Sequence, residues 1–251
     1  MMPVARRGGP LIFAHRGGTE YALENTWEAF DYARSIGVTH CETDAHLSAD
    51  GVVVIHHDDT LECTFGIARA ISDMRWEELQ DVRGRGGERI LRLSDALQSF
   101  PDLYFNIDAK SNQVAVPLVD ELRICNALDR TLVASFSESR LQHLRRYEPA
   151  LSTSLGTTAV ARLLLAAQSA TRPERWCVPG PANGVRAVQV PPIYSGIPVV
   201  TPRFIATAHQ AGLAVHVWTI NDPVQVQQLL AMRVDGIVTD RPTMVRDIVG
   251  A

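Results

Sequence analysis

The fold is indicated first by residues 11–44, LIFAHRGGTEYALENTWEAFDYARSIGVTHCETD. The apolar run Leu11–Ala14 predicts a strand, and apolar residues then recur at helical spacing through Glu24–Ile36, where Gly37 ends the helix. A second strand is predicted over Thr39–Asp44. A strand, a helix and a second, parallel strand form the repeating unit of α/β folds.

The same alternation continues along the chain. Six further strands are predicted at Tyr104–Ala109, Leu132–Ser135, Ser152–Leu155, Ala187–Val190, Ala214–Thr219 and Gly236–Thr239. Helical periodicity lies between them near residues 113–126, 137–146, 157–169, 203–211 and 223–232. Eight strands alternating with helices in 251 residues are typical of a TIM barrel. A doubly wound open sheet is the alternative, but the first strand is not followed by the GxGxxG that would favour it.

Two stretches interrupt the alternation. Val52–His56 follows the second strand too closely for a helix, so we expect an antiparallel hairpin. A turn centred on residues 49–51 places His57 opposite Asp44 and turns His56 to the other face. Residues 58–92, rich in charge and glycine, predict one short helix near 75–81 and are expected to cap the barrel mouth. We therefore expect residues 1–251 to form a single barrel domain with this insertion.

Composition narrows the function. The chain has 24 Lys and Arg against 28 Asp and Glu, and a formal net charge of −4, which gives no reason to expect nucleic acid as a partner. No apolar run is long enough to span a membrane, and the apolar stretch near the start is too short for a signal-peptide core. The four cysteines are scattered without a CxxC pair. We expect a soluble, reduced, cytoplasmic protein.

The reactive side chains of a TIM barrel lie at the C-terminal ends of its strands. In this chain those ends carry His15, Arg16, Glu42, Asp44, Asp108, Lys110, Ser135, Trp218 and Asp240. Several of these residues also have a purely structural interpretation. Ser135 could cap the helix predicted from Ser137, and Asp240 is better explained as a cap of the last helix than as a catalytic acid. The prediction of a site depends on their convergence.

Three carboxylates are the sharpest part of this set. Glu42 and Asp44 lie two apart on one strand and point to the same side, and Asp108 ends the next barrel strand. Buried carboxylates repel each other unless a cation joins them. Oxygen ligands alone favour a hard divalent cation, Mg²⁺ or Ca²⁺. The alternative is that Arg16 and Lys110 neutralise them.

Two histidines favour the cation site over simple neutralisation of the carboxylates. The hairpin brings His57 beside the carboxylates, and His15 lies on the neighbouring strand. Such a pair can act as general acid and general base near neutral pH. Arg16 and Lys110 supply positive charge for phosphoryl oxygens. The residues alone therefore predict phosphodiester cleavage as the class of reaction and nothing more specific.

The sequence also resembles the glycerophosphodiester phosphodiesterase family of cytoplasmic bacterial type. The resemblance is carried in order by His15-Arg16-Gly17-Gly18, Glu24-Asn25-Thr26, Glu42-x-Asp44, Leu47-Ser48-Ala49-Asp50-Gly51, His57-Asp58-x-Thr60-Leu61, Asn106-Ile107-Asp108-x-Lys110, Ser135-Phe136, Val217-Trp218-Thr219-Ile220-Asn221 and Asp235-Gly236-Ile237-Val238-Thr239-Asp240. These motifs run from residue 11 to about residue 242, nearly the whole chain.

The resemblance implies a TIM barrel with an inserted subdomain and assigns roles. By this resemblance, the divalent-cation ligands are Glu42, Asp44 and Asp108, and the acid/base pair is His15 and His57. Arg16 and Lys110 hold the phosphate, and Trp218 shapes the glycerol side. The supporting residues are Glu24, Asn25, Asp58, Ser135 and Asp240. Family members cleave diesters such as glycerophosphocholine to glycerol 3-phosphate and an alcohol. Two positions depart from the family pattern: Asp108 stands where Glu is usual, and Leu23 where Pro is common.

Other interpretations remain open. A related barrel family of lysophospholipase D or sphingomyelinase D type acts on lipids with a similar site, and the loop Pro191–Pro202 could supply an apolar contact through Tyr194 and Ile197. A non-catalytic phosphodiester-binding barrel is a third interpretation. The apolar stretch 161–167 is compatible with a homodimer.

Overall fold

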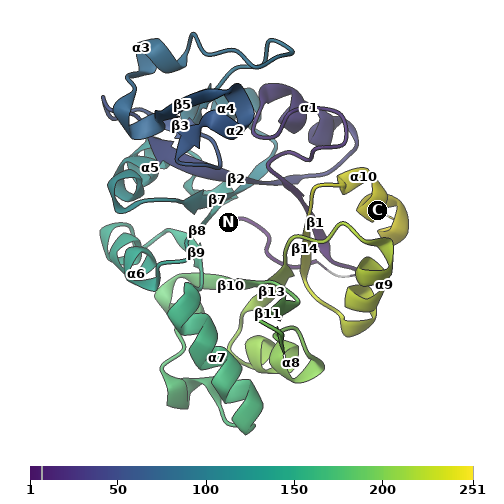
Figure 1. Ribbon diagram of the computed structural model, residues 1–251. Helices are drawn as coiled ribbons and strands as arrows, with labels where there is room; N and C mark the ends of the chain where they lie inside the picture. Colours follow the sequence, from purple (N-terminus) through teal and green to yellow (C-terminus); the bar gives the residue numbers. More distant parts are fainter. Residues whose placement is uncertain (7, 251) are drawn as a thin grey trace.

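Eight parallel strands close into a barrel (Figure 1). The computed structural model describes residues 1–6 and 8–250. The barrel strands are β1 (Leu11–His15), β2 (His40–Leu47), β7 (Tyr104–Ala109), β8 (Thr131–Ala134), β9 (Ser152–Ser154), β10 (Val185–Val190), β13 (Ala214–Val217) and β14 (Gly236–Thr239). The ring closes because β1 pairs with both β14 and β2. The TIM barrel is confirmed, and closure excludes the open sheet.

Helices surround the barrel. They are α1 (Trp27–Ser35), α4 (Leu93–Ser99), α5 (Asn112–Ile124), α6 (Glu138–Tyr147), α7 (Thr157–Ser169), α8 (Pro202–Gln210), α9 (Pro223–Met232) and α10 (Pro242–Val249). Short 3₁₀ turns occupy η1 (Ile71–Asp73), η2 (Leu128–Arg130), η3 (Pro173–Trp176) and η4 (Pro181–Asn183). The first helix starts at Trp27 rather than Glu24 because the Thr26 hydroxyl caps it by accepting from Ala29 N. The seven-residue α4 is too short for a periodicity signal and was not predicted.

Side chains alternate between the outer and inner faces of each strand, so the barrel has one hydrophobic cluster outside it and one inside it. Outward residues of the strands, such as Ile107 and Val215, pack under the helices in the larger cluster. Inward residues, among them Phe13 and Leu132, form a small cluster inside the barrel. The inner space therefore depends on few apolar residues, which leaves inward positions nearer the C-terminal strand ends for polar ones.

We use the term floor for the N-terminal end of the barrel interior, formed by Phe13, His40, Tyr104 and His216 over the chain segment Met2–Val4. His40 stacks on Tyr104 with ring centroids 4.8 Å apart. Figure 1 shows the N-terminus at the centre of the ring of strands. The segment closes the barrel because backbone carbonyls at its residues 3 and 4 accept hydrogen bonds from the two histidines.

The hairpin after β2 is present, but its predicted register is wrong by one residue. β3 (Val53–Ile55) pairs with β2 so that Ala45 faces Ile55, and His56 N donates to Asp44 O. His56, not His57, therefore lies opposite Asp44. β3 ends at Ile55 and the chain bends at residues 57–59, which breaks the alternation of side chains. The bend sends the His57 side chain toward the barrel mouth in spite of the shifted register.

Residues 58–92 hold more structure than the single predicted helix. They form β4 (Thr60–Leu61), α2 (Glu62–Phe65), β5 (Ile67–Ala70), α3 (Trp76–Leu79) and β6 (Leu91–Arg92), and β6 pairs with β3. A third hydrophobic cluster, including Leu61 and Leu79, holds this segment against Val54. Among the described lining residues of the cavity at the barrel mouth, none comes from residues 59–92. The expected capping of the mouth is therefore not observed.

A small hairpin instead stands beside the mouth. It consists of β11 (Ile193–Tyr194) and β12 (Ile197–Pro198), within the loop Pro191–Pro202. Its apolar side chains are exposed, Tyr194 to 65%.

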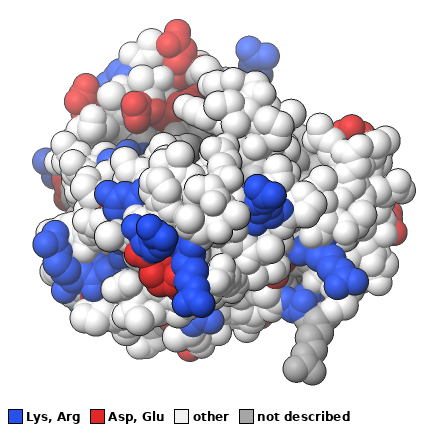
Figure 2. All heavy atoms as spheres, turned by 90° about the horizontal axis from the view of Figure 1, so that it is seen from below, with Lys and Arg blue, Asp and Glu red and all other residues white. Residues whose placement is uncertain are grey.

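Two observations concern the helices and the surface charge. Across the described part of the chain, no helix is both long and apolar enough to cross a bilayer. On the face shown in Figure 2, described basic side chains form separate groups with uncharged surface between them.

Candidate active site

The C-terminal ends of the strands surround a cavity of about 400 Å³. The register of the strands places the lining side chains in layers, because His15 pairs with Glu42 and Asp44 pairs with Asp108. One side, which we name the charged wall, consists of His15, Arg16, Glu42, Asp44, His57, Asp108 and Lys110. The structure thus brings together all seven residues that the sequence assigned to the cation, the two histidines and the phosphate.

Asp44 is the most strongly paired carboxylate of this wall. Its Oδ1 lies 2.7 Å from Lys110 Nζ, and its Oδ2 lies 3.4 Å from Arg16 Nε. Burial would raise the pKa of Asp44, but Lys110 and Arg16 hold it below the usual value. The same contacts, with Asp108 Oδ2 at 3.1 Å from Nζ, raise the pKa of Lys110 against the effect of burial. Asp44 and Lys110 are therefore both charged at neutral pH.

Asn25 fixes the position of the Asp44 side chain. Its Nδ2 donates to Asp44 Oδ2 at 3.3 Å, and its Oδ1 accepts from the Thr43 hydroxyl at 2.7 Å. Asn25 adopts a left-handed backbone with φ 59°, and its N–H donates to Arg16 O at 2.8 Å. Because its side chain and backbone are both bonded, the predicted supporting role of Asn25 has a physical basis.

Arg16 is shared between two carboxylates. Its Nη1 donates to both oxygens of Glu24, at 2.8 and 3.0 Å, while its Nε faces Asp44. The turn that follows requires Gly17, because φ is +86° and a Cβ there would lie 2.6 Å from Ala29 Cβ. The glycine thus allows the loop that carries Arg16 to pack directly against α1.

Glu42 and Asp108 lack full compensation. Glu42 Oε2 and Asp108 Oδ1 are buried and have no hydrogen-bond partner. Burial, followed by the charge of Asp44, raises the pKa of Glu42 to about 8, and burial also raises the pKa of Asp108. Lys110 and Arg16 therefore neutralise Asp44, whereas Glu42 Oε2 faces the His15 ring at 3.7 Å, so neutralisation by Arg16 and Lys110 accounts for only part of the site.

These donors fit a divalent cation. Two orphaned carboxylate oxygens on adjacent strands, beside a third carboxylate, are the hard oxygen ligands that Mg²⁺ and Ca²⁺ prefer. Within residues 1–6 and 8–250, no three His, Cys, Asp or Glu side chains already converge as a finished metal-binding group. Lys110 Nζ bridges Asp44 and Asp108, so these two carboxylates share one positive charge in the structure.

His15 is held by a carboxylate outside the cation cluster. Its Nδ1–H donates to Asp240 Oδ1 at 2.5 Å, and its Nε2 faces Glu42 Oε2 at 3.7 Å. Burial lowers the pKa of His15, but the hydrogen bond to Asp240 and the charge of Glu42 outweigh it and raise the pKa overall. The prediction of Asp240 as a helix cap is wrong, because the N-cap position of α10 is Arg241 and the Asp240 side chain bonds to His15 and Asn221.

Asn221 completes this arrangement and was not among the predicted site residues. Its Nδ2 donates to Asp240 Oδ2 at 2.6 Å, and its Oδ1 accepts from Asp240 N at 2.9 Å. Asn221 lies within one of the motifs quoted above, which was the available signal. Asp240 can therefore present only one fixed oxygen to His15.

As predicted, His57 lies at the cavity and His56 lies on the other face, in spite of the register error. The Nδ1–H of His57 donates to Asp58 Oδ1 at 2.7 Å, and the ring lines the cavity. His56 is buried on the other side, where its Nδ1 bonds to Asp58 O and its ring approaches Phe65. Both His15 and His57 thus have Nδ1 occupied and Nε2 left for a reacting group.

The opposite side of the cavity, which we name the apolar wall, carries no charged side chain among its described lining residues. It is formed by Phe136, Leu155, Val160, Ala161, Leu164, Val190, Pro191, Tyr194, Val199 and Trp218. Phe136 is 65% exposed and meets Trp218 edge to face at 6.0 Å. Trp218 therefore lies at the cavity as predicted, but as part of a larger apolar surface. Most of that surface was missed.

Ser135 and Arg140 act on the backbone rather than on the cavity centre. Ser135 Oγ donates to Ala109 O at 3.2 Å, and Ser137, not Ser135, provides the helix cap. Arg140 donates to Ala109 O and to Ser135 Oγ. Together they hold the end of β7 between Asp108 and Lys110. Nothing in the sequence distinguishes Arg140 from a surface arginine.

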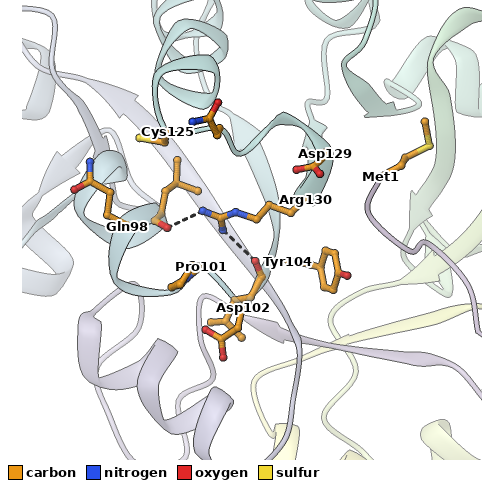
Figure 3. A pocket seen from close by; sticks show the side chains of 11 residues that line it. Met1, Gln98, Pro101, Asp102, Tyr104, Cys125, Asp129 and Arg130 are labelled. Atoms are coloured by element: carbon orange, nitrogen blue, oxygen red, sulfur yellow. Dashed lines mark hydrogen bonds between the residues drawn. The ribbon is translucent and has the colours of Figure 1, made fainter.

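A second cavity, of about 540 Å³, lies near the start of β7 and is shown in Figure 3. Arg130 crosses it, and its guanidinium donates to the backbone carbonyls of Leu97, Phe100 and Leu103. Because these bonds occupy the guanidinium in closing the end of α4, Arg130 is not a free anion-binding group. This cavity lies at the opposite end of β7 from Asp108, so it is not the catalytic one.

Comparison with known proteins identifies the family of the chain. Residues 15–244 match the glycerophosphoryl diester phosphodiesterase family. The chain is 36% identical over 245 residues to a probable glycerophosphodiester phosphodiesterase 2 of Mycobacterium tuberculosis, covering 97% of this chain and 92% of that protein. It is also 35% identical over 123 residues to the human lysophospholipase D GDPD1, covering 43% of this chain and 39% of that protein.

A solved structure shows the same fold. It is an Oleispira antarctica phosphodiesterase in complex with its product sn-glycerol-3-phosphate, with a TM-score of 0.81 and 21% identity, covering 97% of this chain and 98% of that chain. The match over residues 15–244 and the Mycobacterium relative carry the assignment: this chain belongs to the glycerophosphoryl diester phosphodiesterase family and is an enzyme of that class.

Proposed function

We propose that the enzyme hydrolyses glycerophosphodiesters to glycerol 3-phosphate and an alcohol, with a divalent cation and with His15 and His57 as the acid/base pair. The observation that carries the proposal is the charged wall, where two histidines with free Nε2 atoms lie beside three carboxylates and two cations. Every element of the predicted phosphodiester chemistry is on that wall.

Glu42, Asp44 and Asp108 would hold the cation. When bound, it supplies positive charge that orients the phosphodiester and offsets the charge of the transition state. The unpaired oxygens of Glu42 and Asp108 would be compensated by such an ion. Arg16 and Lys110 bind the remaining phosphoryl oxygens through charge-assisted hydrogen bonds.

The two histidines move protons at their Nε2 atoms. One accepts the proton of a substrate glycerol hydroxyl as that oxygen attacks phosphorus, and the other donates a proton to the departing alcohol. Water then opens the resulting cyclic phosphate, with the proton transfers reversed. Asp240 and Asp58 keep each imidazole in the tautomer that leaves Nε2 facing the cavity.

Incubation with glycerophosphocholine tests the proposal. We expect glycerol 3-phosphate to form in the presence of Mg²⁺ or Ca²⁺, and to stop forming when the metal is removed by a chelator and return when it is added back. The double variant His15→Ala/His57→Ala serves as the blank. Absence of product from several glycerophosphodiesters with both metals would refute the proposal.

The apolar wall favours a second candidate substrate, a lysophospholipid whose acyl chain lies along it. Ten lining residues without a charge are more than a choline or ethanolamine group requires, whereas an alkyl chain gains about 0.8 kcal/mol for each CH₂ that it buries. The human relative's name also describes it as a lysophospholipase D.

Adjacent leucines of α7 provide a matched test of this candidate. Leu164 lines the cavity, whereas Leu165 is 46% exposed outside it. Leu164→Asn should lower the hydrolysis of lysophosphatidylcholine more than that of glycerophosphocholine, and Leu165→Asn should change neither. Equal effects of Leu164→Asn on both substrates would argue against an acyl site on this wall.

We further infer that the insertion and barrel form one domain in a reducing, cytoplasmic location. Apolar side chains of the insertion pack against Val54 of the hairpin that extends β2, and all four cysteines are free. The homodimer stays a prediction: within the stretch 161–167, Ala161 and Leu164 line the cavity, whereas Leu165 is exposed.

A further inference from the structure

A chain of hydrogen bonds runs through the barrel interior from the floor to the cavity. It begins at the Val4 carbonyl, passes through His216 and Gln189, and ends at Asn106. His216 and Gln189 are neighbours in register on β13 and β10. Asn106 pairs with Glu42, so its side chain lies one level below Asp44 and Asp108 on the inward face of the barrel.

The polarity of this chain is determined at its floor end. A backbone carbonyl can only accept, so His216 Nε2–H must donate to Val4 O, at 2.8 Å. In the neutral ring Nδ1 is then an acceptor, and it accepts from Gln189 Nε2 at 3.2 Å. Burial lowers the pKa of His216, which keeps the ring neutral. Gln189 Oε1 in turn accepts from Asn106 Nδ2 at 3.5 Å.

The carbonyl oxygen of Asn106 is therefore the acceptor left over at the end of this chain of hydrogen bonds. The side chain is 3% exposed and lines the cavity, and Oδ1 has no hydrogen-bond partner. An unpaired buried acceptor is costly, which indicates that a donor from a ligand completes it.

The chemistry of the substrate identifies that donor. Phosphoryl oxygens of an ionised diester only accept hydrogen bonds, and a choline group has no N–H. In a glycerophosphodiester such as glycerophosphocholine only the glycerol hydroxyls can donate. We propose that Asn106 is a specificity-determining residue that accepts a hydrogen bond from a glycerol hydroxyl, with Gln189 and His216 as the positioning residues that fix its amide orientation. This inference rests on the proposed glycerophosphodiester substrate.

Binding measurements test the inference without turnover. The probes are sn-glycerol 3-phosphate and propyl phosphate, which has the same carbon chain without hydroxyls, titrated by calorimetry in the presence of Mg²⁺. The wild-type enzyme should bind sn-glycerol 3-phosphate about tenfold more tightly than propyl phosphate. Asn106→Leu should abolish that difference by weakening sn-glycerol 3-phosphate alone.

Two further variants complete the design. Gln189→Leu cuts the chain one link away and should reduce the difference about threefold, through loss of the fixed orientation. Ser152→Ala is the control, because Ser152 lies in the same barrel layer through its pairing with Leu132, which pairs with Asn106. It should leave both affinities unchanged. The ratio of two affinities measured on one preparation does not depend on the fraction of folded protein.

The inference is overturned if wild-type enzyme binds the two phosphates equally, or if Asn106→Leu weakens both to the same degree. The second result would assign Asn106 to the phosphate, to a cation-bound water or to folding. Failure of the proposed function is a separate result, since it appears as absence of turnover in wild-type enzyme whatever the binding ratio.

Discussion

Two pairs of histidines lie at opposite ends of one barrel interior. His15 and His57 are at the mouth, where each donates Nδ1–H to a carboxylate. His40 and His216 are at the floor, where each donates Nε2–H to a backbone carbonyl. The pKa of His15 is raised, whereas burial lowers the pKa of His40 to about 4 and also lowers that of His216.

The difference between the pairs lies in their partners. A carboxylate supports the protonated ring and leaves Nε2 free to exchange a proton, which suits acid/base catalysis. A carbonyl beneath apolar rings favours the neutral ring and fixes its tautomer, which suits a structural hydrogen bond. The mouth should therefore control turnover and the floor should control stability.

The largest effects should come from the mouth histidines. His57→Ala and His15→Ala are each expected to lower kcat on glycerophosphocholine about 10³-fold, because each removes one proton transfer. His56→Ala, one residue away on the opposite face, should keep most of the activity. Circular dichroism verifies folding of all three. If His56→Ala were the inactive variant, the assignment of His57 to the cavity would be wrong.

Glu42→Gln should cost about 10²-fold in activity at low metal concentration, through a weaker cation site. Activity should recover partly as Mg²⁺ is raised, and the midpoint of the Mg²⁺ titration should move upward. Asp108→Glu, which restores the residue usual in the family, serves as the comparison and should keep a midpoint near that of the wild type. An unchanged midpoint in Glu42→Gln would remove Glu42 from the cation site.

The sequence was sufficient for the barrel because its signals are local. Strand and helix periodicities and the Glu42-x-Asp44 spacing follow from residues next to each other. The hairpin register was wrong by one because the bend at residues 57–59 interrupts the alternation. Asn106 stands within a quoted motif, but its role, like that of Arg140, depends on groups brought from distant strands and helices.

At the floor, His40 should make stability depend on pH. The unfolded chain binds a proton near pH 6.5 and the folded chain near 4, so between these values the unfolded state binds more protons. The free energy of unfolding should therefore fall with decreasing pH, by about 2 kcal/mol from pH 7 to 5. Urea titrations at both pH values measure this change. His40→Phe retains the stacking but should lose this contribution, and an equal pH dependence in the variant would show that His40 is not its source.

Met2→Ala should produce the smallest effect and separate the two ends most directly. Met2 is 2% exposed and packs in the inner cluster with Phe13 and Leu132. Truncating a buried methionine costs a few kcal/mol in a rigid core, and a chain end can readjust, so we expect a loss of about 1–2 kcal/mol in urea unfolding. Turnover below the unfolding transition should not change, because Met2 contributes no link to the hydrogen-bond chain that ends at Asn106. Leu165→Ala, at an exposed site on α7, is the control and should change stability by less than about 0.5 kcal/mol. A loss of turnover in Met2→Ala while the protein remains folded would mean that the floor acts on the site through packing, and the division between the two ends would not hold.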